Sequence, residues 1–74
     1  MAYTVYSKQS CVFCKRAKDL LDLLGEDFTE IDITEGDNRT QLNERLGYEA
    51  RTVPQIWHGD TYVGGFTELS TYVK

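Results

Sequence analysis

The two cysteines of this 74-residue chain stand three positions apart, in the sequence C-V-F-C at residues 11–14. Directly before them lies the apolar run Ala2 to Tyr6, which is typical of a buried strand. Directly after them, apolar residues recur at steps of three and four, which predicts an amphipathic helix. The sequence therefore places a dithiol at the start of a helix that follows a strand, and this arrangement favours redox chemistry.

The rest of the pattern predicts a small α/β domain spanning residues 1–74. The helix over residues 11–24 ends at Gly25, and residues 28–33 form a second strand. A strand, a helix and a strand in succession imply a parallel pair with a right-handed crossover. The later elements are predicted as a helix from its cap Asp37 to Leu46 with Gly47 at the C-cap, strands at 53–58 and 61–63 around Gly59-Asp60, and a helix capped by Thr67 that runs to Val73.

Charge and hydropathy exclude several classes of partner. The net charge of −4 argues against a nucleic-acid partner, because phosphate binding needs a basic surface. No apolar run approaches the roughly 18 residues that span a bilayer, and the chain start lacks a signal-peptide pattern, so we expect a cytoplasmic protein without a membrane partner. Half of the basic residues nevertheless surround the dithiol, as Lys8, Lys15, Arg16 and Lys18. A solvated helix face would show the same charges.

The two thiols are expected to differ in role. Only a thiolate attacks a disulfide, and Cys11 lies where the helix N-terminus, Lys8 and Lys15 all favour negative sulfur. Cys14 lies one turn further in and should be more buried, so we expect Cys11 to attack and Cys14 to resolve. The alternative is a buried, unreactive thiol pair, which the basic surroundings disfavour.

Metal binding is the competing use of this cysteine spacing. A closed zinc site needs four ligands, whereas the chain offers two cysteines and one histidine, His58. We therefore expect no metal site and interpret His58 as a surface residue near a strand end. An iron–sulfur cluster shared by two chains remains an alternative.

Four segments in order resemble a dithiol glutaredoxin, and the resemblance covers essentially the whole chain. They are Y-S-K at 6–8, C-V-F-C-K-R-A-K at 11–18, T-V-P-Q-I at 52–56 and G-G-F-T-E-L at 64–69. The resemblance implies a thioredoxin-like fold, β-α-β-α-β-β-α, with a four-stranded mixed sheet flanked by helices. The chain departs from the family's usual C-P-Y-C, because Val12 and Phe13 separate the cysteines, and Glu68 replaces a commoner Asp.

The same resemblance implies a glutathione site around the dithiol. It predicts a cis Val53–Pro54 bond, with Thr52 and Val53 along the peptide backbone of glutathione, whereas a trans proline opening an edge strand is the alternative. Exposed Phe13 and Tyr48 would contact protein substrates. The γ-glutamyl end would meet the last helix at Gly65, Phe66, Thr67 and Glu68, and the glycyl carboxylate would meet Lys8 and Arg51, assisted by Arg39 or Gln41.

The expected function is that of a monomeric, glutathione-dependent thiol–disulfide oxidoreductase. Its substrates would be protein disulfides, including that of ribonucleotide reductase, and glutathione mixed disulfides. Two alternatives are a redoxin reduced by thioredoxin reductase and a non-catalytic zinc or iron–sulfur module.

Overall fold

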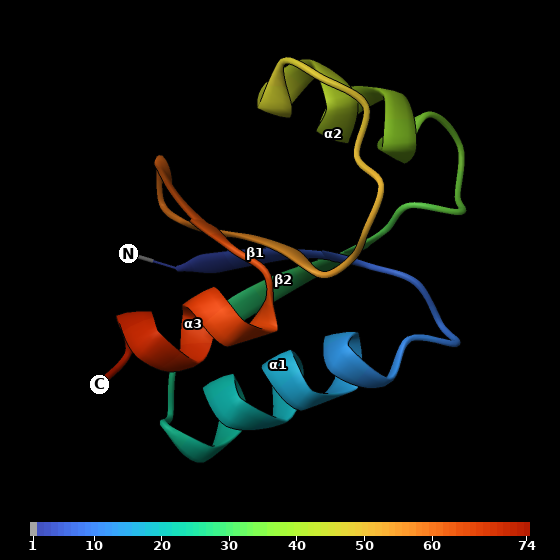
Figure 1. Cartoon of the computed structure of the whole chain (residues 1–74). Helices are drawn as coiled ribbons and strands as arrows, with labels where there is room; N and C mark the ends of the chain where they lie inside the picture. Colours follow the sequence, from blue (N-terminus) through green and yellow to red (C-terminus); the bar gives the residue numbers. More distant parts are fainter. Residues whose placement is uncertain (1) are drawn as a thin grey trace.

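The computed structural model describes residues 2–74, which form four strands and three helices in the predicted order (Figure 1). The elements follow the chain as β1 (Tyr3–Ser7), α1 (Val12–Leu23), β2 (Phe28–Asp32), α2 (Asn38–Leu46), β3 (Gln55–His58), β4 (Thr61–Gly64) and α3 (Phe66–Tyr72). Within this part of the chain, no helix has the length and apolarity required to cross a membrane.

The strands form one mixed sheet in the order β2-β1-β3-β4. β1 and β2 run parallel, with Tyr3 opposite Phe28, and α1 makes the crossover between them. β1 and β3 are antiparallel, as are β3 and β4. The four-stranded mixed sheet and the parallel first pair are therefore confirmed.

The sheet separates two apolar clusters (Figure 1). On the face covered by α1 and α3, Val5 and Ile56 pack with Leu21 and Leu69. On the face covered by α2, the buried cluster consists of Tyr6, Leu42, Ala50 and Trp57. Alternating side chains of β1 enter opposite clusters, as expected for a strand buried on both sides. This double burial holds the end of β1, and hence the loop to the dithiol, in a fixed place.

At the helix ends, the predicted cap after α2 is confirmed and the predicted cap before α3 is wrong. Gly47 ends α2 at φ 83°, as predicted, because glycine adopts the left-handed region without a Cβ clash. The predicted Thr67 cap is wrong, since α3 begins at Phe66 and Gly65 occupies the cap position. Gly65 has no side chain to cap the helix, and the Glu68 carboxylate instead accepts from the Gly65 N–H at 2.8 Å. Asp37 does precede α2 but makes no side-chain cap hydrogen bond.

The last predicted strand pair is also shifted at its start. β3 begins at Gln55, two residues later than expected, and a cis bond joins Val53 to Pro54 immediately before the strand. The predicted cis bond is thus confirmed. The segment before β3 consequently lies beside the start of α1 rather than in the sheet, since the Cys11 sulfur contacts Val53.

Candidate active site

Cys11 caps the N-terminus of α1 with its own sulfur. Its backbone is extended, with φ −109° and ψ 112°, and its Sγ accepts a hydrogen bond from the Cys14 N–H at 3.2 Å. This N–H is one of the donors that the first turn of a helix leaves without a backbone partner. A sulfur in this position gains stabilisation when it becomes negative, because both the N–H and the helix dipole favour an anion.

Cys14 lies one turn inside the helix and is 1% exposed, whereas Cys11 is partly exposed. Burial, followed by the hydrogen bond with Cys11, raises the pKa of the Cys14 thiol to about 12. The Lys8 backbone amide and the Lys18 charge act in the opposite direction but do not outweigh burial. The predicted difference in exposure between the two sulfurs is confirmed, and Cys14 is a thiol at neutral pH.

The Cys11 thiol also contacts the segment before β3. It donates to the Val53 carbonyl at 3.4 Å, across 42 residues of sequence. Pro54 is buried behind Val53, while Thr52 in front of it is exposed. The Cys11 sulfur and the Val53 backbone therefore face the same space, so an extended chain attached to Cys11 would meet this backbone.

A cavity of about 240 Å³ lies on the α3 side of this contact. The rings of Phe13 and Phe66 border it with their centroids 6.0 Å apart, and the Arg16 guanidinium lies 5.2 Å from the Phe13 centroid. The structure brings eight predicted residues together here: Phe13, Thr52, Val53, Pro54, Gly65, Phe66, Thr67 and Glu68.

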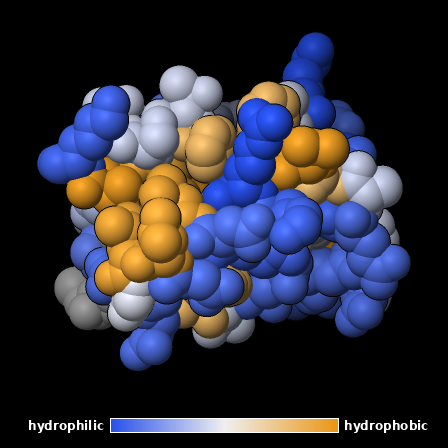
Figure 2. All heavy atoms as spheres, turned by 90° about the horizontal axis from the view of Figure 1, so that it is seen from below, coloured by the Kyte–Doolittle hydropathy of each residue, from blue (hydrophilic) through white to orange (hydrophobic). Residues whose placement is uncertain are grey.

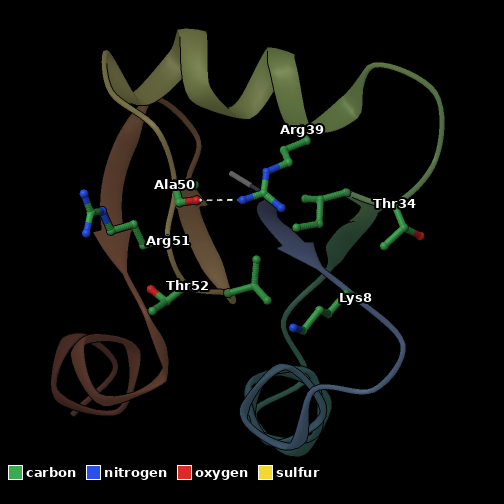
Figure 3. A pocket seen from close by; sticks show the side chains of 8 residues that line it. Lys8, Thr34, Arg39, Ala50, Arg51 and Thr52 are labelled. Atoms are coloured by element: carbon green, nitrogen blue, oxygen red, sulfur yellow. Dashed lines mark hydrogen bonds between the residues drawn. The ribbon is translucent and has the colours of Figure 1, made fainter.

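A second cavity, of about 190 Å³, lies on the other side of Val53, between β1, the end of β2 and α2. In Figure 3, Lys8 and Arg39 extend into it from opposite sides, whereas the Arg51 side chain extends away from both. Arg39 is held there by a hydrogen bond to the Ala50 carbonyl at 3.2 Å. Gln41 does not line this cavity, and its amide instead donates to Asp37.

The resemblance implies only an assisting role for Arg39, whereas the structure places its guanidinium in this cavity opposite Lys8. The missed signal is the spacing within α2. Arg39 lies in the first turn of the helix and Leu42, three residues later, is buried against the sheet. Residues three apart lie on neighbouring parts of one helix face, so Arg39 is carried toward the sheet and the cavity.

The face formed by α1 and α3 carries exposed apolar groups at both ends of α1. Val12 and Phe13 are 65% and 52% exposed at its start, and Leu23 and Leu24 are exposed at its end. Figure 2 shows this side of the molecule, with apolar areas separated by hydrophilic side chains. Tyr48 is 59% exposed, as predicted, and borders a further hollow with Tyr62 and Gln55, which shares Thr52 with both cavities.

Among residues 2–74, no group of three or more potential ligands is arranged to hold a metal ion. His58 contacts the Tyr72 hydroxyl at 2.8 Å and stacks on Tyr3 with ring centroids 4.2 Å apart. These contacts place its ring in an aromatic group at the far end of β3.

Comparison with known proteins agrees with this geometry. The glutaredoxin family model matches residues 3–63. The chain belongs to the glutaredoxin family. It is 31% identical to Glutaredoxin 1 of Escherichia coli K12, over 100% of the chain and 94% of that protein. It is also 43% identical to a glutaredoxin of Pseudomonas aeruginosa, over 88% of the chain and 76% of that protein.

Solved structures of glutaredoxins share the fold. The structure of reduced Escherichia coli glutaredoxin superposes with a TM-score of 0.83 at 30% identity, covering 99% of this chain and 93% of that one. A complex of buckwheat glutaredoxin with glutathione gives 0.80 at 28% identity, covering 96% of this chain and 66% of that one. The predicted thioredoxin-like fold is confirmed, and this glutaredoxin is a thiol–disulfide oxidoreductase.

The raised pKa of Cys14 predicts slow alkylation of this residue. In a Cys11→Ser variant at pH 8, we expect iodoacetamide to modify folded Cys14 at least about a hundredfold more slowly than the same residue in the urea-unfolded chain, because thiolate is scarce and access is limited. The rate should still rise between pH 8 and pH 10, since the thiol titrates above this range. Mass spectrometry measures it. Comparable rates in the folded and unfolded chains would contradict the assignment of Cys14 as a buried thiol.

Proposed function

We propose that Cys11 of this glutaredoxin attacks protein disulfides and glutathione mixed disulfides, that Cys14 resolves the protein-bound intermediate, and that glutathione restores the dithiol. The single observation that carries this proposal is the position of the Cys11 sulfur. It caps α1 and contacts the Val53 carbonyl at 3.4 Å, and Val53 in turn lines two cavities, one with basic side chains and one bordered by the start of α3.

The reaction proceeds by thiol–disulfide exchange. The Cys11 thiolate attacks one substrate sulfur, the substrate disulfide breaks and its other sulfur leaves as a thiolate. Cys14 then loses its proton to solvent and attacks Cys11, which releases the second substrate thiolate and closes the Cys11–Cys14 disulfide. One glutathione thiolate opens that disulfide by attacking Cys11. This attack releases Cys14 as a thiolate. A second glutathione thiolate then attacks the sulfur of the bound glutathione, which releases oxidised glutathione and the Cys11 thiolate, so both cysteines are reduced again.

The two cavities suit the two ends of glutathione. Lys8 and Arg39, with Arg51 nearby, provide positive charge for the glycyl carboxylate. On the other side, the γ-glutamyl carboxylate would meet the Thr67 hydroxyl and the amides of the first turn of α3. The Glu68 carboxylate already accepts from Gly65, so it is held in place to face the γ-glutamyl amine.

We further propose that the protein acts as a single-domain monomer in the cytoplasm and that ribonucleotide reductase is among its protein substrates. Exposed Phe13 beside the Cys11 sulfur, and Tyr48 beyond it, support contact with a protein chain. The similarity of the chain to the glutaredoxins of Escherichia coli and Pseudomonas aeruginosa supports bacterial proteins as its substrates.

The proposed carboxylate contacts predict changes in KM for glutathione. Lys8→Gln and Arg39→Gln should each raise KM about three- to tenfold, because each removes a charge that binds substrate. The kcat of Arg39→Gln should change little, since Arg39 does not line the hollow that holds Cys11. Arg51→Gln should raise KM less, since the Arg51 side chain lines the cavity but extends away from Lys8 and Arg39 (Figure 3). Steady-state kinetics with glutathione reductase and a small mixed disulfide measure these values.

Lys74→Gln is the matched control for these variants, because Lys74 is exposed and lines neither cavity. Its KM should change less than about twofold. Unchanged KM in both Lys8→Gln and Arg39→Gln would show that the glycyl carboxylate binds elsewhere.

The division of roles predicts opposite results for the two cysteine variants. Cys11→Ser should abolish all activity, because no other thiol can begin the exchange. Cys14→Ser should still reduce small glutathione mixed disulfides, where a second glutathione releases the first, but should lose most turnover on protein disulfides. It should also accumulate a glutathione adduct on Cys11, visible by mass spectrometry and removed by dithiothreitol. Activity retained by Cys11→Ser would refute the assignment.

A further inference from the structure

Three polar side chains from separate elements meet beside the dithiol. The Glu30 carboxylate on β2 accepts from the Ser7 hydroxyl at the end of β1, at 2.6 Å, and from the Lys18 ammonium on α1, at 2.7 Å. Ser7 is 1% exposed, so its side chain is held within the core. Its hydrogen bond therefore holds one oxygen of the Glu30 carboxylate in place. The same oxygen holds Lys18, and the ammonium is thereby confined to one position.

Lys18 lies four residues after Cys14 on the same helix, so the two side chains share one face of α1. Its ammonium lines a surface hollow with Cys11, Lys8 and Glu30, which connects the ion pair with the attacking sulfur. The Lys18 charge acts to lower the pKa of Cys14, and Cys14 acts to raise the pKa of Lys18. Exposed Lys15 is adjacent to Cys14 in sequence but is not among the charges that shift the pKa of Cys14.

We propose that Lys18, held by Glu30 and Ser7, is a positioning residue that stabilises the negative charge of the Cys14 sulfur while this sulfur resolves a mixed disulfide on Cys11. This inference rests on the roles proposed above for the two cysteines. In the resolving step, the Cys14 proton goes to solvent, the bond between Cys11 and the substrate sulfur breaks, the Cys11–Cys14 bond forms and the substrate sulfur leaves with the electron pair.

The charged surroundings of this pair favour such a role. The groups acting on Cys14 are the Cys11 sulfur, the Lys8 amide and Lys18, and of these only the amide and Lys18 favour a thiolate. Once Cys11 forms a mixed disulfide, its sulfur carries no negative charge. The Coulombic effect of Cys11 that disfavours a thiolate on Cys14 is then lost. Lys18 in turn faces Glu30 from β2 and Asp19 from its own helix, and both keep it protonated by raising its pKa.

The resolving step can be followed with 5,5′-dithiobis(2-nitrobenzoate) as the substrate disulfide. Mixing with the reduced protein should release the yellow thiolate in two phases, the first from attack by Cys11 and the second from resolution by Cys14. Lys18→Met keeps the packed methylene groups and removes the charge. Its second phase should slow about three- to tenfold at pH 7 and its pH midpoint should rise by about 0.5 to 1 unit, because a thiol without the nearby cation loses its proton less readily.

The controls separate charge from packing. Lys18→Arg should restore the second phase to within about threefold of the parent, and Lys74→Gln, which removes an exposed charge that does not line the hollow, should leave it within about twofold. Lys18→Gln repeats the test should Lys18→Met fold poorly, and an unchanged first phase shows that the site is intact. A normal second phase in both uncharged variants, or an equally slow one in Lys18→Arg, would overturn the inference. A parent protein without a second phase would overturn the proposed role of Cys14 as well.

Discussion

The hydrogen bond from the Cys14 N–H to the Cys11 sulfur connects the fold with the chemistry. It gives the first turn of α1 its cap, and it gives the Cys11 sulfur a hydrogen-bond donor of the kind that favours negative charge. The bond forms with the Cys11 backbone extended, at the end of the short segment 8–11 that leads from β1 into α1. The double burial of β1 and its parallel pairing with β2 fix that entry, so the sheet positions the sulfur.

Burial then makes two identical side chains chemically different. Cys11 lies at the helix cap beside an open backbone, while Cys14 is enclosed one turn away and its pKa is raised to about 12. A thiol with such a high pKa is a poor nucleophile until it meets a mixed disulfide held next to it, where proximity compensates for the small thiolate fraction. This difference supports the proposal that Cys11 makes the first attack and that Cys14 resolves the intermediate.

Much of this arrangement could be predicted from the sequence, because it depends on local patterns. The apolar repeat in α1, the left-handed glycine after α2 and the C-V-F-C spacing each act over a few residues. The α3 cap could not be read in this way. Thr67 has the side chain of a good cap, but the Glu68 carboxylate reaches the Gly65 N–H and the helix starts one residue earlier.

Side-chain orientation and long-range contacts were also beyond the sequence pattern. Arg39 and Arg51 are equally basic, and only the packing of α2 on the sheet shows that Arg39 faces Lys8. Ser7 and Glu30 lie 23 residues apart and meet because β1 and β2 pair in register, which places the two residues two positions apart across neighbouring strands.

The central claim is that the Cys11 sulfur presents glutathione to two cavities on either side of Val53. A crystal structure of Cys14→Ser with glutathione disulfide-bonded to Cys11 tests it most directly. We predict that the glutathione backbone lies along Val53, with its glycyl carboxylate near Lys8 and Arg39 and its γ-glutamyl end at Thr67. Glutathione lying over Tyr48 and Tyr62, or along the ion pair of Lys18 and Glu30, would contradict the account.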